Sequence, residues 1–215
     1  FNRTTIRMIE LSNINEDGRR MMFARLNTGG TKLSDMEKRR GTSSSPFMKL
    51  VDEIAQDERT IYLTPLPQSK LKRREREEYV LRFFAYLDDY QLFNKSVQEF
   101  LAEYISKTDQ NIPQQADEYK DIFFKTFDFV NRNFECGFRR SSNINIVSRV
   151  RFEAISVGVA LALREHPALL TQSNINVDWA FSEEFLSMIR SDASNSRPKV
   201  IMRIEYVKDK LLAQI

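Results

Sequence analysis

The sequence predicts a mostly α-helical protein, with a short α/β lead-in followed by a helical bundle. Along most of the chain, apolar residues recur at i, i+3, i+4 and i+7, which is the spacing of one helix face. Glycine and proline each occur only 6 times in 215 residues, so the sequence favours long helices over many turns. Hydrophobic residues make up 41% of the chain and include 16 phenylalanines, enough for a sizeable core. We expect the lead-in to span residues 1–40 and the bundle to span residues 41–215.

The lead-in begins with a predicted strand. Residues 4–11 are β-branched and apolar, and a lone strand of this kind needs partners from outside the segment. Residues 21–26 carry an apolar helical face, which ends at the glycine turn of residues 27–30. Residues 34–37 then form a capping box that begins the next helix. We therefore expect the order strand, helix, glycine turn and helix.

Seven amphipathic stretches predict the helices of the bundle. They are a helix that begins at Ser45-Pro46, one from near Ser69 to Leu87, one over 97–105, a longer one from Pro113 to Phe134, one over 152–163, one over 181–189 and one over 200–211. The 152–163 stretch is apolar nearly all round, so we expect this helix to lie buried at the centre. Polar loops are expected over 131–146 and 191–196.

Composition excludes several kinds of site. The single cysteine, Cys136, argues against a disulfide framework and a cysteine zinc site, and fits a reducing compartment, so we expect a cytoplasmic protein. The single histidine, His166, argues against a Ser-His-Asp set, a histidine metal site and an HNH nuclease within this chain. No apolar run approaches the length of a membrane span. Carboxylates are plentiful but scattered, and Asp88-Asp89 has no partner visible in the sequence. We expect neither a metal site nor a membrane partner.

Basic residues gather in clusters, although the formal net charge is only +3. One run comprises Lys70, Lys72, Arg73, Arg74 and Arg76, and a further group comprises Arg139, Arg140, Arg149 and Arg151. Glu75, Glu77 and Glu78 are interleaved with the first run, which is typical of a solvated, salt-bridged helix face. Such a density of cations also suits contact with the phosphate backbone of DNA. The sequence leaves both interpretations open for the run and for Arg139 and Arg140.

The glycine turn belongs to a longer motif that resembles a known family. The segment Phe23-Ala24-Arg25-Leu26-Asn27-Thr28-Gly29-Gly30-Thr31, followed by Leu33-Ser34, Glu37 and Arg39, is similar to the signature F-x-R-L-N-x-G-G-x-x-L-S-x-x-E-x-R. This signature is that of the GmrSD-type restriction endonuclease N-terminal domain, domain-of-unknown-function family 262. Arg151-Phe152-Glu153-Ala154 and the ending Arg203-Ile204-Glu205-Tyr206-Val207 agree more weakly. Arg40 stands where the family usually has Asn, and the family's Asp-Gly-Gln-Gln-Arg motif is absent from this chain.

The resemblance implies that the lead-in is the remnant of a ParB-like core and the bundle the C-terminal helical part of a prokaryotic anti-phage, restriction-type protein. It implies nucleotide hydrolysis and nuclease activity in the complete protein, with a nucleoside triphosphate and Mg²⁺ as cofactors and with DNA and a nuclease domain or subunit as partners. Since the chain begins at Phe1 and lacks the family's catalytic motif, we expect it to be part of a longer product and inactive alone.

Candidate nucleotide or phosphate-binding residues follow from this motif: Arg25, Asn27, Gly29, Gly30, Glu37 and Arg39. Arginine offers phosphate a bidentate fork, and a glycine turn beside a helix N-terminus offers free amides. Glu37 also has a purely structural explanation in the capping box. The alternative to the enzyme-associated interpretation is a non-catalytic helical module that binds DNA or another protein.

Overall fold

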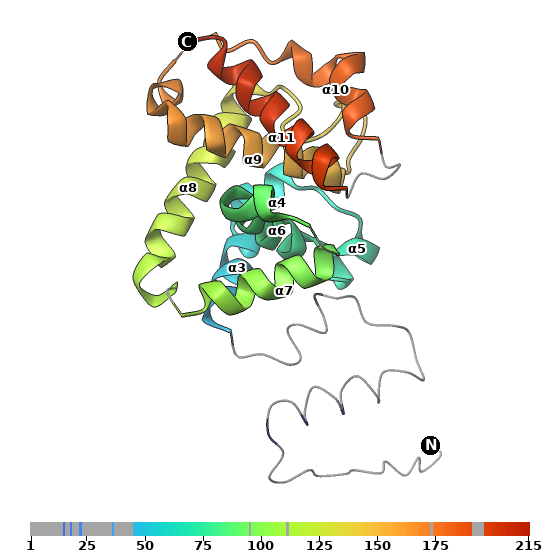
Figure 1. Ribbon diagram of the computed structural model, residues 1–215. Helices are drawn as coiled ribbons and strands as arrows, with labels where there is room; N and C mark the ends of the chain where they lie inside the picture. Colours follow the sequence, from blue (N-terminus) through green and yellow to red (C-terminus); the bar gives the residue numbers. More distant parts are fainter. Residues whose placement is uncertain are drawn as a thin grey trace, which may run out of the picture. The chain divides into compact units, whose positions relative to one another are not determined.

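The computed structural model describes residues 45–94, 96–110, 112–172, 174–190 and 196–215, together with Asn15, Gly18, Met22 and Met36. The chain divides into two units, Phe1–Ser44 and Ser45–Ile215. The strand and the glycine turn expected in the lead-in, and all of its two expected helices except Met22 and Met36, therefore lie outside the described residues. The described part of the second unit is built of helices and contains no strand, which confirms the mostly α fold class (Figure 1).

Helices α3 to α11 and three short 3-10 helices make up this unit. They are α3 (Pro46–Gln56), α4 (Glu58–Leu63), α5 (Gln68–Lys72), α6 (Glu75–Asp89), η2 (Tyr90–Leu92), α7 (Val97–Thr108), α8 (Ile112–Asn133), α9 (Arg149–Glu165), η3 (Pro167–Leu170), η4 (Asp178–Phe181), α10 (Glu183–Met188) and α11 (Arg197–Leu212). Ser45 begins α3 as expected, because its Oγ accepts from the Met48 amide at 3.0 Å and a proline follows it.

The central position of α9 is confirmed. This helix packs against α6, α8 and α11, and nearly all its side chains are buried (Figure 1). Phe152, Ile155 and Val159 have no exposed surface. A helix that is apolar on every side is stable only where other helices cover it, so the bundle is organised around α9.

A glycine allows α9 and α11 to approach closely. A Cβ atom placed on Gly158 would lie 2.5 Å from the Cβ of Val207 and 2.8 Å from the carbonyl oxygen of Ile204, both on α11. No side chain fits in that space, so glycine at this position sets the distance between the two helices.

Aromatic side chains form the core that joins the helices on either side of α9. The ring of Phe123 lies 5.0 Å from that of Phe83 and 4.2 Å from that of Phe127, between centroids. Phe152 in turn lies 6.1 Å from Phe127 and 4.9 Å from Tyr79. Edge-to-face and stacked aromatic pairs at these distances stabilise a core beyond their burial alone. The phenylalanines that recur at helical spacing in the sequence therefore pack in the core.

The helix expected from near Ser69 to Leu87 is instead two helices, α5 and α6, and the prediction of one continuous helix is wrong. Arg74, between them, adopts the left-handed conformation with φ of 60°. This conformation ends a right-handed helix and is uncommon for a residue with a Cβ atom. The short helix α4 has no counterpart among the predicted helices.

Candidate functional site

The residues of the glycine-turn motif lie outside the described part of the chain. This holds for all six candidate nucleotide or phosphate-binding residues, Arg25, Asn27, Gly29, Gly30, Glu37 and Arg39. The structure therefore bears only on candidate residues of the second unit.

Arg74 and Arg76, two cations of the basic run, bind other side chains of the protein. Arg76 is 8% exposed, and its Nε donates to the hydroxyl of Thr64 at 3.2 Å. Burial lowers the pKa of the Arg76 guanidinium. The Nη1 of Arg74 lies 2.7 Å from Oε1 of Glu77, which is itself buried. The exposed, two-turn cationic face that the sequence suggested therefore does not form as a unit.

The remaining candidate cations are closer to solvent. Lys72, Arg73 and Arg140 are exposed, and Arg139 is partly exposed. The Nε of Arg139 donates to the Cys136 carbonyl at 3.2 Å. In the described part of the chain, no carboxylate binds Lys72 or Arg140. These four side chains are hereafter called the surface cations.

The structure brings the two basic segments together at Glu75. Its Oε1 lies 2.7 Å from Nη2 of Arg149 and 3.5 Å from Nζ of Lys70. Backbone contacts hold the same segments: the Val147 amide donates to the Pro65 carbonyl at 3.2 Å. The loop before α9 therefore packs against the chain just before α5, although the two are far apart in sequence.

Near Glu75, four charged side chains form a network that extends into the core, hereafter the buried charge network. They are Glu78 and Arg82 on α6, Glu153 on α9 and Arg203 on α11. Glu153 accepts from Arg82 Nη1 at 2.7 Å and from Arg203 Nη2 at 2.6 Å. Arg82 also lies 2.8 Å from Glu78, whose Oε1 is 3.7 Å from Arg149 Nη1 at the surface. The α6 glutamates Glu75, Glu77 and Glu78 are salt-bridged, as expected. Their side chains are largely buried, so the expectation of a solvated face is wrong.

The network is electrostatically complementary. Burial by itself lowers the pKa of Arg82, but Glu153 and Glu78 together outweigh burial, so the pKa of Arg82 is raised. Glu153 bridges two arginines from different helices and is fully buried. Glu153 therefore links α6, α9 and α11, which is a structural role.

Among Arg139, Arg140, Arg149 and Arg151, only Arg151 lies inside the protein. Its guanidinium donates to the carbonyl of Phe138 at 3.2 Å and to that of Ala180 at 2.7 Å. It lies 5.2 Å from the ring centroid of Phe181. Burial lowers the pKa of Arg151 to about 10. Arg151 therefore ties the loop before α9 to η4 and does not belong to the surface cations.

The two aspartates at the end of α6 do have partners, which the sequence did not reveal. The Tyr104 hydroxyl donates to Asp88 Oδ2 at 2.6 Å, and Arg164 Nη2 lies 3.2 Å from Asp88 Oδ1. Lys107 Nζ lies 2.9 Å from Asp89 Oδ2. Burial, and then the carboxylate of Asp88, raise the pKa of the Tyr104 hydroxyl.

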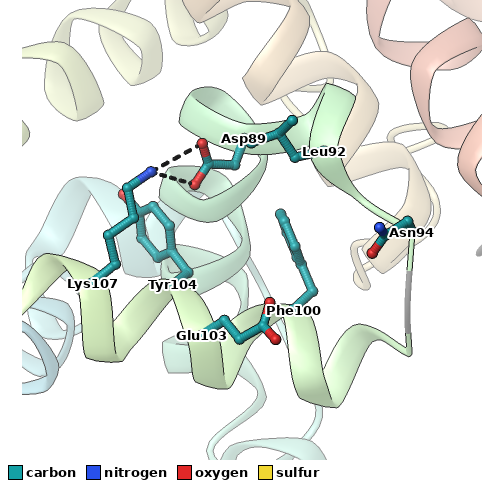
Figure 2. Close-up of a pocket in the computed structure, with 7 residues that line it drawn as sticks. All are labelled: Asp89, Leu92, Asn94, Phe100, Glu103, Tyr104 and Lys107. Carbon is teal, nitrogen blue, oxygen red and sulfur yellow. Dashed lines mark hydrogen bonds and ion pairs between the residues drawn. The ribbon is translucent and has the colours of Figure 1, made fainter.

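A depression lies on each side of this helix end. The α6–α7 pocket has a volume of about 280 Å³ and is lined by Asp89, Leu92, Asn94, Phe100, Glu103, Tyr104 and Lys107 (Figure 2). The α8–α9 pocket has a volume of about 350 Å³ and is lined by Asp88, Gln115, Glu118, Tyr119, Ile122 and Arg164. Each combines one aspartate of α6 with a tyrosine and a cation from a neighbouring helix.

The described residues contain no group of three or more His, Cys, Asp or Glu side chains that could hold a metal ion. His166 is exposed at the C-terminal end of α9. No helix in this part of the chain is both long enough and apolar enough to cross a membrane.

No protein-family model, no curated protein and no solved structure matches this chain. The resemblance to the GmrSD-type domain therefore rests on the sequence motif alone, and the structure of residues 45–215 has to be interpreted from its own geometry.

Proposed function

We propose that residues 45–215 form a non-catalytic helical module that binds DNA through its phosphate backbone. The observation that carries this proposal is the meeting of the two basic segments at Glu75, with Lys72 and Arg140 exposed nearby in sequence and bound by no carboxylate among the described residues. Cations without protein partners are the ones that can neutralise phosphates and release counterions. The buried charge network supports the proposal, because it fixes the helices from which these segments extend.

The proposed interface contains fewer cations than the seven that the sequence offers for contact with DNA. Arg74 and Arg76 are engaged with Glu77 and Thr64, and Lys70 with Glu75. Of the surface cations, Lys72 and Arg140 have no carboxylate partner among the described residues, and they are the residues that we assign to phosphate contacts. Contacts of this kind position DNA without reading its sequence, so we expect binding to any duplex.

The family resemblance places this module in a larger context. We infer from the motif that the complete protein is a GmrSD-like prokaryotic defence protein, in which the helical module supports a nucleotide or DNA phosphate site. Arg25, Asn27 and the Gly29-Gly30 turn would then form one wall of that site. A charged bidentate contact to phosphate is worth about 1.5–3 kcal/mol, so Arg25→Ala should weaken nucleotide binding by the complete protein about 10- to 100-fold. Unchanged affinity would refute this role.

The DNA proposal is tested by salt-dependent binding of the full chain to a short fluorescent duplex, measured by anisotropy. The double variant Lys72→Gln/Arg140→Gln should bind more weakly, and the slope of log affinity against log salt should fall by about 2, or about 0.9 for each lost phosphate contact. The matched control is Lys107→Gln/Lys125→Gln, which removes two exposed cations that already have carboxylate partners. Its slope should equal that of the parent. No binding at about 50 mM salt, or equal slopes for both double variants, would refute the proposal.

A further inference from the structure

The α6–α7 pocket has an aromatic wall and a carboxylate rim. Figure 2 shows the ring of Phe100 between Leu92 on one side and Glu103 on the other, with the Asp89 carboxylate at the far edge. Tyr104 forms the adjoining wall. Both rings are largely buried, so the protein holds them in place. An aromatic face beside a carboxylate attracts an organic cation, through the ring quadrupole and through charge.

A cation of the protein already occupies the edge of this pocket. Both oxygens of Asp89 accept from Lys107 Nζ, at 3.2 Å and 2.9 Å. The Lys107 side chain is 66% exposed, and an ion pair with that exposure adds little to stability. Another cation can therefore replace the Lys107 ammonium at small cost. A planar guanidinium suits Asp89 better, because it donates two parallel hydrogen bonds and stacks on a ring.

The neighbouring pocket shows the same recognition within the chain. In the α8–α9 pocket, Arg164 lies 3.2 Å from Asp88, the residue before Asp89, and Tyr119 lines the same wall. One aspartate at the end of α6 thus binds an arginine beside a tyrosine. The other, Asp89, is paired with the exposed Lys107 beside an open depression.

We propose that the α6–α7 pocket binds an arginine side chain of a partner protein. The guanidinium binds Asp89 and contacts the part of the Phe100 ring that reaches the pocket, while Leu92, 68% exposed, contacts the apolar part of the partner. Asp89 accepts a cation in this pocket, whereas the backbone of nucleic acid presents phosphate anions, so the pocket favours a basic peptide. This site is independent of the proposed DNA interface and stands if that proposal fails.

The test uses the full chain and a blocked Gly-Arg-Gly peptide as the probe. Backbone amide resonances of the α6–α7 pocket are followed by nuclear magnetic resonance during titration. We expect saturable shifts at Leu92 and Phe100 with a dissociation constant on the order of 1 mM, as for a single side-chain contact. The citrulline peptide has the same shape without the charge and should bind at least about 10-fold more weakly. Equal binding of the two peptides would overturn the proposal.

Two variants of one ion pair should act in opposite directions. Asp89→Asn removes the acceptor and should lower the affinity for the arginine peptide about 10-fold. Lys107→Gln removes the competing cation and should raise this affinity several-fold. Lys125→Gln, which breaks a comparable exposed pair with Asp121, should leave it unchanged. Weaker binding by Lys107→Gln would overturn the proposal. So would a dimer of the parent chain that Asp89→Asn dissociates, because the occupant would then be a second copy.

Discussion

At the residue scale, two tyrosines on α6 show that the same kind of hydroxyl group stabilises the fold at one position and not at another. Tyr79 and Tyr86 are both fully buried, and each ring is stacked on a phenylalanine, Phe152 and Phe100 respectively. The Tyr79 hydroxyl donates to the Val147 carbonyl at 2.8 Å. The Tyr86 hydroxyl has no hydrogen-bond partner among the described residues. A buried hydroxyl without a partner loses its hydration and gains nothing in return.

Removal of each hydroxyl should therefore have a different result. Tyr79→Phe leaves the Val147 carbonyl without its donor and should lower the free energy of unfolding by about 1–2 kcal/mol. Tyr86→Phe should leave it unchanged or raise it by up to about 1 kcal/mol. Urea unfolding followed by circular dichroism measures both. An equal loss in the two variants would show that the Tyr86 hydroxyl also makes a stabilising contact.

The buried charge network makes a second prediction at this scale. Glu153→Gln keeps the shape of the side chain but leaves the buried guanidiniums of Arg82 and Arg203 without their shared carboxylate. Breaking a buried pair in this way should cost about 3–5 kcal/mol in unfolding free energy. The control, Asp121→Asn, breaks the exposed pair with Lys125 and should cost less than about 1 kcal/mol. A loss in Glu153→Gln as small as in the control would contradict the structural role of the network.

At the scale of elements, the sequence predicted those helices that are long enough to show a period. The apolar spacing located α3, α7, α9 and α11. It missed α4, whose six residues bury only Thr60 and Leu63 and so show no clear period, whereas the equally short α10 lies within the predicted 181–189 helix. It also missed the break between α5 and α6, because the left-handed residue there is Arg74, and neither glycine nor proline marks the position.

The candidate site was less predictable than the helices. Periodicity identifies the buried face of a helix but does not identify the helix that covers it. Arg82 and Glu153 are 71 residues apart in sequence, and Arg149 and Glu75 are 74 apart. Only the packing of α6 against α9 brings these pairs together. For the same reason the partners of Asp88, on α7 and α9, could not be inferred from a chain of scattered carboxylates.

The close approach of α9 to α11 makes a prediction at the element scale. In Gly158→Ala the new methyl group would overlap Val207 and the Ile204 carbonyl, so the helices must move apart. Overpacking of a buried contact should lower the free energy of unfolding by about 1–3 kcal/mol. The double variant Gly158→Ala/Val207→Ala should recover only part of this loss relative to Val207→Ala alone, since the backbone carbonyl stays in place. A neutral Gly158→Ala, measured by thermal unfolding, would contradict the close contact.

At the scale of the whole molecule, buried ionisable groups on several helices should couple stability to alkaline pH. Burial raises the pKa of Tyr79, Tyr86 and Tyr104, with the neighbouring carboxylates adding to its effect. Above about pH 10, the unfolded chain releases these protons and the folded protein keeps them. The folded state therefore binds more protons, and stability falls as pH rises. Arg151, whose pKa burial lowers, acts in the opposite direction on one proton.

Three tyrosines less one arginine give about two protons, so these four groups should lower the free energy of unfolding by about 3 kcal/mol for each pH unit above pH 10. The pKa values of Tyr90, Tyr119 and Tyr206 are also raised and act in the same direction. Urea unfolding measures this slope at about pH 9 to 11, the range in which an ordinary tyrosine titrates. Absorbance at about 295 nm detects tyrosinate. Tyrosinate should appear from the three buried side chains only with unfolding. Tyr86→Phe removes one titrating group that makes no hydrogen bond. The free energy of unfolding of this variant should therefore fall less steeply with pH, by about 1.4 kcal/mol per pH unit. An identical slope in parent and variant would mean that the Tyr86 hydroxyl titrates while the bundle is folded, and that α6 is accessible to hydroxide at its most buried point.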